Sequence, residues 1–407
     1  AIALDPLDPA FEQREATTPQ RLRRAGLQLA PDTQTVLPRL LLGPLLLSWP
    51  LPLVFGSELV SHPEREAVSH VWGLWAALRE LSPLVLDSDL LNHPDGVRVV
   101  VIDPIHVPIY ALAGWISAAA GFNAVVLFGL LVAGVAGALA AREVQGQAWL
   151  GALVAMACPA MLAATAEGTT EDLGVGWVLL QLALLLRFTR TGRPRDGLLA
   201  GLALAAAVHA GPYNGVWAGL IDASVGLYWI GRDRPRALRA LVVGAGALLV
   251  SLPWAWAVLV LRPDHLPGGG QHLHSQGALP EIREAADSFR GGLWHGADLL
   301  DPWLPGPLTG GEGEVSHTAY VGLVALVVAV VVVVRDRQRW PWLLGAVAFS
   351  LISLGPWLYL GGEALRLGDS GLLGPVGVAM KVLPGLSRLT RWYRAGAVAA
   401  LLLAPLV

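Results

Sequence analysis

The run "NAVVLFGLLVAGVAGALAA" (residues 123–141) contains no charged side chain. As an α-helix it is long enough to cross the hydrocarbon core of a bilayer, which is roughly 30 Å thick and needs about 20 residues. In lipid only helices and closed barrels satisfy their backbone polar groups, and so long an apolar run is unsuited to a barrel strand. Similar runs recur, and we expect membrane-spanning helices at 36–55, 123–141, 147–164, 173–187, 197–211, 215–230, 238–261, 317–334, 340–360 and from about 393. The sequence therefore predicts an all-α, polytopic transmembrane helical bundle of about ten spans.

The composition supports a membrane protein. Of the 407 residues, 54% are hydrophobic and 14% charged, and the mean hydropathy is +0.56. A soluble protein has about 25% charged residues, so this chain lacks the polar surface that water requires. The single cysteine, Cys158, excludes an internal disulfide and a cysteine-cluster metal site. A net charge of −3 gives no reason to expect a nucleic-acid partner.

The two ends of the chain differ from its middle. Residues 1–35 are polar and contain prolines, and we expect a disordered cytoplasmic tail before a transmembrane domain at 36–407. The last apolar run stops at Val407, which leaves it too short to cross a bilayer. This predicts that the sequence is a C-terminally truncated part of a longer protein.

The arginines indicate an orientation. If residues 104–121 ("PIHVPIYALAGWISAAAG") lie on the membrane as a surface helix, the short arginine-rich loops all fall on the side of the N-terminus. That side is then cytoplasmic, because basic loops are retained there. The opposite loops, at 56–122, 165–172, 262–316 and 361–392, hold most of the carboxylates, and the histidines lie in them or at the adjoining helix ends. We therefore expect function on the outer face, with surface helices in the long first outer loop.

The outer segment "AEGTTED" (166–172) has two interpretations. Glu171 and Asp172 could stabilise the start of the next helix through its dipole, with Thr169 and Thr170 as N-cap residues. Alternatively, Glu171 and Asp172 could hold a divalent cation such as Mg²⁺ or Mn²⁺, which prefers oxygen ligands. The sequence leaves both open.

Two further groups suggest other roles. Asp222 lies inside an expected span, where a carboxylate is costly and needs a partner, and His209 is a candidate for that partner. A structural contact is one interpretation and a transporter is the other, although we see no repeats or broken helices of the kind transporters use. His272 and His274 form a His-x-His pair without an evident third ligand, and we interpret them as surface-loop histidines.

Four stretches carry a resemblance to a known family. They are "SWPLPLVFGSELVSHPEREAVSHVWGLWAAL" (48–78), "LLNHPDGVRV" (90–99), "ADLLDPWLPGPLTGGEGEVSHTAYVGLVAL" (297–326), and "LISLGPWLYLGG" followed by "LPGLSRLTRWYRAG" (383–396). In their order and spacing they resemble the GT-C superfamily of membrane glycosyltransferases, and within it the large bacterial proteins of the YfhO type. The resemblance implies a multi-pass protein of the bacterial inner membrane that transfers a sugar from a polyprenyl-phosphate donor to a glycan, lipid or protein acceptor at the outer face. It also implies an apolar groove for the lipid tail.

The resemblance also assigns candidate residues. Glu66, six positions before Trp72, matches the first-loop acid that acts on the acceptor, and Glu64 is its neighbour. Glu66 is longer by one methylene than the aspartate usual in the superfamily, about 1.5 Å. Asp172 is the expected second acid. For the donor phosphate and head group, the matching candidates are Arg388, Arg391, Arg394, His317 and Tyr320.

The arginine motif departs from the family's pattern, because the proline usual between its arginines is missing here. A different expectation is also consistent with the sequence: a non-catalytic membrane protein that transports or assembles lipid-linked glycans on the same scaffold. Convergence of Glu66 with Glu171 and Asp172 in space favours the enzyme.

Overall fold

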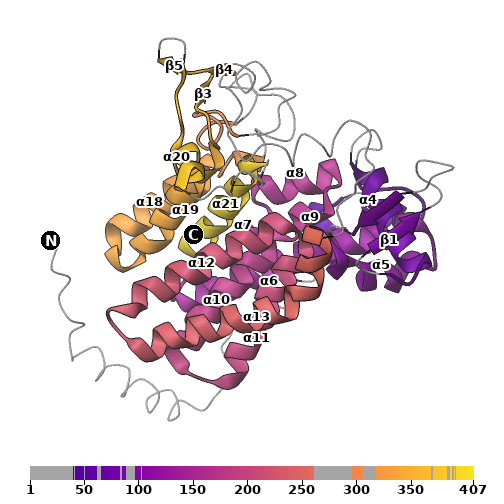
Figure 1. The fold of residues 1–407 in the computed structure, drawn as a ribbon, viewed down its shortest axis with the longest axis horizontal. Coiled ribbons are helices and arrows are strands. Elements are labelled where there is room, and N and C mark those ends of the chain that lie inside the picture. Colours follow the sequence, from indigo (N-terminus) through magenta and orange to yellow (C-terminus); the bar gives the residue numbers. More distant parts are fainter. Residues whose placement is uncertain are drawn as a thin grey trace.

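The structure, a computed structural model, describes most of the chain between Leu40 and Val407 (Figure 1). The described residues are 40, 42–49, 51–61, 66–82, 85–88, 97–101, 103–260, 296–305, 318–367, 370–382, 386, 389 and 391–407. Most of them are helical, as predicted. The expected tail at 1–35 lies outside the described residues.

Helices occupy the positions of the expected spans. They are α6 (Ala118–Glu143), α7 (Ala148–Met156), α8 (Pro159–Glu167), α10 (Val175–Thr191), α11 (Pro194–Ala210), α12 (Pro212–Ile230), α13 (Arg234–Val260), α18 (Leu323–Arg335), α19 (Trp340–Ser353) and α21 (Ala395–Leu403). By length and composition, three helical stretches of the described chain suffice to cross a membrane: Ala118–Glu143, Thr170–Thr191 and Arg234–Trp254. A fourth results if α7 and α8, bent by 41° at the break before Pro159, count as one span. The described helices thus indicate a membrane protein.

The expected span at 36–55 is not one continuous helix. Its described part turns at Ser48 and Trp49, and a short helix, α3, follows at Leu51–Val54.

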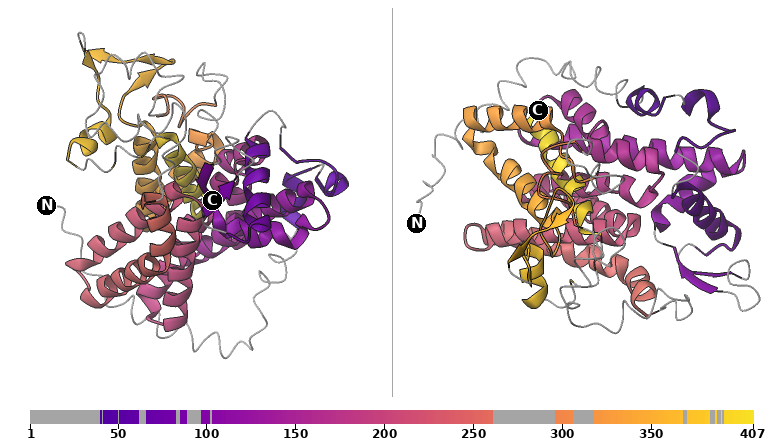
Figure 2. Two further views of the ribbon diagram at one scale, coloured as in Figure 1. Left: turned by 45° about the vertical axis from the view of Figure 1, so that its right-hand side comes forward. Right: turned by 90° about the horizontal axis from the view of Figure 1, so that it is seen from above.

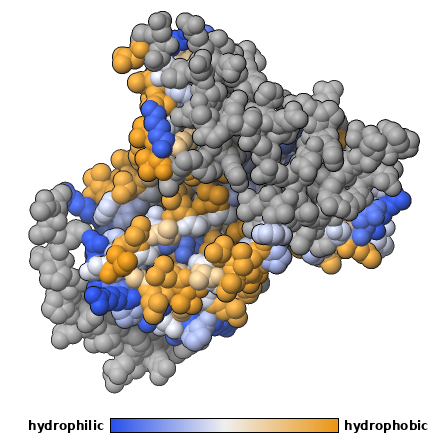
Figure 3. Space-filling view, in the orientation of Figure 1, coloured by the Kyte–Doolittle hydropathy of each residue, from blue (hydrophilic) through white to orange (hydrophobic). Residues whose placement is uncertain are grey.

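Small residues bring the helices close together. Gly137 of α6 lies so near Gly151 of α7 that an added Cβ would stand 2.2 Å from the carbonyl oxygen of Gly151. Such close approach is how membrane helices gain packing contacts without a hydrophobic driving force between them. Hydrophobic side chains cover the outward faces of α11–α13 and α18 (Figure 3), including the exposed Leu241, Leu248 and Val324.

The expected first outer loop folds into a separate layer beside α8 and α9 (Thr170–Leu173; Figure 1). It contains α4 (Ala67–Arg79), the antiparallel strands β1 (Val85–Ser88) and β2 (Val97–Val100), the 3₁₀ turn η1 (Pro104–His106) and α5 (Val107–Gly114). At 1.5 Å per residue, the eight residues of α5 reach only about 12 Å. The stretch 104–121 therefore does not cross a bilayer as one helix, and its placement on the membrane surface stays a prediction.

The last helical segment of the chain runs inward among the other helices (Figure 2) and is buried. The 3₁₀ turn η4 (Trp392–Arg394) leads into α21, whose residues are all buried, and a last turn, η5, covers Ala404–Leu406. α21 packs against α19, α10 and α8. Beside it, α20 (Pro375–Val382) adjoins two antiparallel pairs, β3 (Tyr359–Leu360) with β4 (Glu363–Ala364) and β5 (Arg366–Leu367) with β6 (Ser370–Gly371). These short hairpins, like β1–β2, are the departures from an all-α fold.

The two ends of the helical bundle differ chemically. At the C-terminal end of α10, Arg190 pairs with Glu143 at 2.9 Å and Arg187 with Asp196 at 3.4 Å. Arg239 donates there to the carbonyl of Thr189. At its N-terminal end, about 25 Å away, α10 follows directly on Glu171 and Asp172. Three paired arginines, Arg187, Arg190 and Arg239, thus lie at one end of α10, and the candidate acids lie at the other.

Candidate functional site

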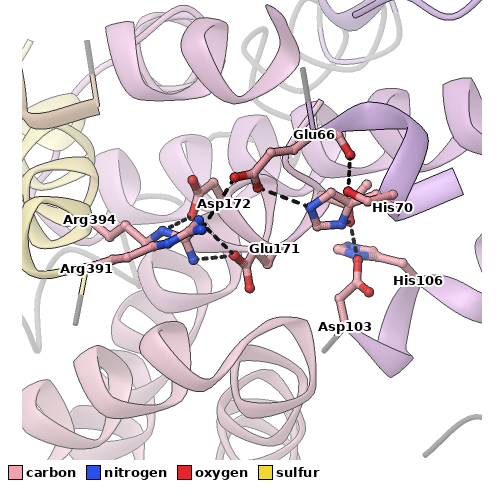
Figure 4. A network of polar contacts seen from close by, with 10 residues as sticks. Glu66, His70, Asp103, His106, Glu171, Asp172, Arg391 and Arg394 are labelled. Carbon is pink, nitrogen blue, oxygen red and sulfur yellow. Dashed lines mark hydrogen bonds and ion pairs between the residues drawn. The ribbon is translucent and has the colours of Figure 1, made fainter. Parts of the chain in front are cut away.

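Residues from three distant parts of the chain meet at the acidic end of the bundle (Figure 4). Glu66 lies at the start of α4, Arg391 directly precedes η4, and Arg394 is the last residue of η4. Glu171 and Asp172 lie on α9 (Thr170–Leu173), a single helical turn before α10. The expected convergence of Glu66 with Glu171 and Asp172 is therefore present.

Gly168 makes this convergence possible. It ends α8 with φ +78°, a left-handed backbone conformation that side chains with a Cβ adopt at a cost. A Cβ at Gly168 would lie 2.5 Å from the Cβ of Ala67 and 2.7 Å from Oγ of Ser61. The α8–α9 turn thus rests directly on the first turn of α4, which brings α9 next to Glu66.

A second close approach fixes α9 from its other side. A Cβ at Gly174 would lie 2.5 Å from the Cβ of Ala210, at the end of α11. Asn214, near the start of α12, donates to the backbone carbonyl of Glu171 at 2.7 Å. The backbone that carries the two acids is therefore held by both α11 and α12.

Arg394 forms the buried base of the site. Its side chain is 4% exposed, and its guanidinium pairs with Glu171 and, from Nε, with Oδ1 of Asp172 at 3.1 Å. The guanidinium also lies over the ring of Tyr213, 5.2 Å from the centroid. Because a buried charge is tolerated only with a partner, these contacts fix Arg394 and both carboxylates together.

Arg391 forms the accessible part. Its side chain is 35% exposed, and it bridges Oε1 of Glu66 at 3.4 Å and Oε1 of Glu171 at 3.9 Å. The backbone N–H of Arg391 donates to the hydroxyl of Tyr213 at 3.0 Å. Glu66 is 38% exposed. A carboxylate and a guanidinium thus stand side by side where a ligand can reach both.

The other oxygen of Glu66 faces His70, one helical turn further along α4. His70 Nε2 lies 3.7 Å from Oε2 of Glu66. The hydrogen bond to His70, with the charges of Arg391 and Arg394, lowers the pKa of Glu66 to about 2, although burial opposes the shift. Burial lowers the pKa of His70, but the hydrogen bond to Glu66 and the charges of Asp103 and Glu171 outweigh it, and the pKa is raised. Glu66 is accordingly ionised at neutral pH.

A buried polar chain continues from His70. Its Nδ1 lies 2.8 Å from the hydroxyl of Thr170, which donates to Oδ2 of Asp103. The same oxygen lies 3.2 Å from Nδ1 of the fully buried His106. Burial raises the pKa of Asp103, but hydrogen bonds from His106 and Thr170 and the nearby histidine charges lower it overall.

Of the residues expected from the sequence, five form this cluster: Glu66, Glu171, Asp172, Arg391 and Arg394. Glu64, Arg388 and His317 lie outside the described residues, as do His272 and His274. Tyr320 is described, and its hydroxyl accepts from the backbone N–H of Leu323 at the start of α18. No hydrogen bond or ion pair joins it to the cluster within the described part of the chain.

Two sequence interpretations need correction. Thr169 occupies the N-cap position of α9, but its side chain forms no capping hydrogen bond. Thr170 does not cap either, because its hydroxyl is engaged with His70 and Asp103. Asp222 does not pair with His209. Gln181 of α10 approaches it at 3.5 Å, whereas His209 bonds to the carbonyl of Ala205.

The divalent-cation hypothesis stays a prediction. Glu171 and Asp172 face the guanidinium of Arg394, which supplies the positive charge that a cation would bring. Among the described residues no group of three His, Cys, Asp or Glu side chains is arranged to hold a metal ion. In this arrangement the guanidiniums of Arg391 and Arg394 supply the positive charge beside the carboxylates.

Sequence reasoning missed the buried chain of His70, Thr170, Asp103 and His106, together with Tyr213. One signal was available: Glu66 and His70 are four residues apart, which places them on one face of a helix. Asp103 and His106 are three apart and offer the same signal. The link between the two pairs through Thr170 depends on tertiary packing and has no sequence signature.

Comparison with known proteins gives one match. The model of a family described as "Domain of unknown function (DUF6311)" matches residues 60–373. The match contains Glu66, Glu171 and Asp172, and it ends before Arg391 and Arg394. No curated protein and no solved structure matches the chain.

Proposed function

We propose that this chain, which belongs to the DUF6311 family, is an integral membrane glycosyltransferase using a polyprenyl-phosphate sugar. The acceptor is a glycan, lipid or protein at the outer face of the bacterial inner membrane. The resemblance in four stretches to the GT-C superfamily motivates the reaction class, and the site supports it.

One observation carries the proposal: Glu66 and Arg391 lie 3.4 Å apart, and both are partly exposed. Transfer from a lipid phosphate needs a carboxylate near the acceptor hydroxyl and a cation near the leaving phosphate. The guanidinium of Arg391, which also lies 3.9 Å from Glu171, is 35% exposed, and its planar charged group suits phosphate oxygens. The pair supplies both requirements at one point.

The helices around the site favour an anion as well. α4 begins directly after Glu66, α10 shortly after Asp172, α12 just before Tyr213 and α21 directly after Arg394. The positive ends of four helix dipoles therefore converge where the leaving phosphate develops charge. Together with two guanidiniums they offset the three carboxylates.

In the proposed reaction, ionised Glu66 accepts a hydrogen bond from the acceptor hydroxyl and orients its oxygen toward the sugar C1. The bond from C1 to the phosphate oxygen breaks, and the phosphate keeps the electron pair beside Arg391. The acceptor oxygen bonds to C1, and its proton passes to Glu66. A carboxyl with a pKa near 2 holds that proton weakly, so its principal contribution is orientation.

The same proposal covers the membrane arrangement. The arginine-rich end of the bundle faces the cytoplasm, the site faces outward, and the scaffold has about ten spans with GT-C architecture. The apolar faces of α13 and α18 lie against lipid.

A second candidate is a non-catalytic protein that transports or assembles lipid-linked glycans. It is favoured by the closed pairing of the site, because the two oxygens of Glu66 already face Arg391 and the ring of His70. The same network would form if Glu66, Arg391 and His70 only held the first loop against η4.

Turnover separates the two candidates. Purified protein in lipid nanodiscs is incubated with a panel of polyprenyl-phosphate sugars, and released polyprenyl phosphate is measured for wild type, Glu66→Gln and Glu80→Gln. Glu80, an exposed acid at the end of α4, is the matched control. We expect release by wild type and Glu80→Gln and loss of about 10²–10⁴-fold in Glu66→Gln. Equal release by all three proteins removes Glu66 from the reaction, and none by any of them favours the non-catalytic protein.

A further inference from the structure

The proposed reaction leaves the buried chain behind Glu66 without a role. Hydrogen bonds join His70, Thr170, Asp103 and His106 behind Glu66, and Nε2 of His70 lies 3.7 Å from the carboxylate of Glu66 (Figure 4). His70 and Asp103 have side chains that are 10% and 7% exposed, and that of His106 is fully buried. Burying so many ionisable groups is costly unless each is satisfied, so the directions of the hydrogen bonds are informative.

Those directions follow from Asp103. An ionised carboxylate only accepts, so Thr170 and Nδ1 of His106 both donate to it. Thr170 has a single hydroxyl proton, and the hydrogen bond to Asp103 uses it. The oxygen of Thr170 can then only accept from His70, which requires the proton on Nδ1 of His70. The titrating nitrogen is therefore Nε2, and this is the atom that faces Glu66.

We propose that His70 is a positioning residue for Glu66, held by Thr170 and Asp103 in the tautomer that carries its proton on Nδ1, with Nε2 directed at the carboxylate. A second part rests on the proposed function: Nε2 of His70 receives the proton that Glu66 takes from the hydroxyl of the sugar acceptor. A third group that fixes a histidine tautomer is a general device for proton transfer.

The proton balance is simple. The acceptor O–H bond breaks and the proton bonds to Glu66, which passes it to the lone pair of His70 Nε2. His70 changes from neutral imidazole to imidazolium, Nδ1 keeps its proton, and Glu66 is again ionised. After product release the proton leaves to water past the partly exposed Glu66.

The groups around His70 stabilise the imidazolium. Glu66 faces it from its own helix, Asp103 from the segment before η1 and Glu171 from α9, and all three are acidic. His106 acts from behind Asp103 as a neutral or cationic donor. Since Nε2 must be free to accept, turnover is lost as the pH falls through the pKa of His70, which lies above 6.5.

The test reads the tautomer directly. The 407-residue chain, labelled with ¹⁵N-histidine in nanodiscs, is titrated by NMR, and His70 is assigned with His70→Gln. We expect a protonated Nδ1 at every pH and an Nε2 that titrates above 6.5. In Thr170→Val, which lacks the hydroxyl, the proton of neutral His70 should distribute over both ring nitrogens. In Thr170→Ser, which keeps the hydroxyl, it should stay on Nδ1. A proton on Nε2 in neutral wild-type His70, or no change in Thr170→Val, overturns the positioning role.

Turnover with polyprenyl-phosphate sugars tests the proton step. We expect Thr170→Val and His70→Gln to lower kcat by about 10–100-fold with KM nearly unchanged, and His70→Gln to lose the acidic limb of the pH profile. An unchanged profile in His70→Gln overturns the proton step while the proposed function stands. If wild type turns over no donor, the proton step falls with the proposed function, and the NMR result still decides the positioning role.

Discussion

Arg391 and Glu66 are 325 positions apart in the sequence, yet their side chains pair at 3.4 Å. The contact joins the first loop to the segment before α21, and Glu171 holds Arg391 from the opposite side. Because Arg391 and Glu66 are both partly exposed, they are available to a ligand, whereas Arg394 beneath them is buried. The site is thus layered, with a structural base and an accessible rim.

The buried base is expected to contribute strongly to stability. Arg394→Met removes the buried cation that pairs with both Glu171 and Asp172, and the more exposed Arg391 remains beside Glu171. We expect a loss of about 3–5 kcal/mol in the free energy of unfolding. Thermal unfolding in detergent measures it, with Arg79→Met, an exposed arginine on α4, as the control at about 0–1 kcal/mol. Equal melting temperatures for the two variants would show that Arg394 is not the anchor.

The turn at Gly168 is expected to tolerate no side chain. Gly168→Ala adds a Cβ in a left-handed conformation against Ala67, and we expect a loss of about 1–3 kcal/mol. Gly219→Ala on α12 is the control, since its Cβ meets open space and alanine favours a helix. Circular dichroism melts compare the two. A Gly168→Ala protein as stable as Gly219→Ala contradicts the close approach of α8 and α4.

Arg391 is expected to bind phosphate. Arg391→Gln removes a charge-assisted contact, which is worth about 1.5–3 kcal/mol, so polyprenyl phosphate should bind about 10–100-fold more weakly. Binding is measured by titration into nanodiscs, with Arg79→Gln as the control because that exposed arginine lies away from the site. Unaltered affinity in Arg391→Gln assigns the phosphate to another group.

Stability is expected to depend on pH in two opposite ways. The pKa of Glu66 is lowered from 4.5 to about 2, so its contribution is complete above 4.5 and is lost as the pH falls toward 2. The pKa of His70 is raised, so its contribution is complete below 6.5 and is lost as the pH rises through the folded value. Melting temperatures of wild type should decline above pH 6.5, and those of His70→Gln should decline less. The same slope in both proteins would place the titration elsewhere.

The sequence predicted the helices and much of the accessible rim, because both have local signals. Apolar runs with few charges predicted α6, α10 and α13, and resemblance to a family singled out Glu66 and Arg391 of the rim and Arg394 of the base. The buried chain was missed because Thr170 was interpreted as a cap, a role that its local position favours. Its hydroxyl instead reaches His70, 100 positions earlier, through packing made possible by Gly168.

The other departures have similar causes. The interruption at Ser48 and Trp49 occurs within an apolar run whose hydropathy gives no warning of it. Asp222 was assigned His209 because the two lie on consecutive helices, but Gln181 on α10 reaches it instead. Partners across a bundle depend on helix rotation, which apolar runs do not specify.

A double-mutant cycle on donor turnover tests the central claim, that Glu66 and Arg391 act as one centre. Release of polyprenyl phosphate is measured for wild type, Glu66→Gln, Arg391→Gln and the double variant under identical conditions. If the two side chains act together on the leaving group and the acceptor, the double variant loses little more activity than the worse single variant. Losses that multiply, or a wild-type protein that releases no polyprenyl phosphate, would contradict it.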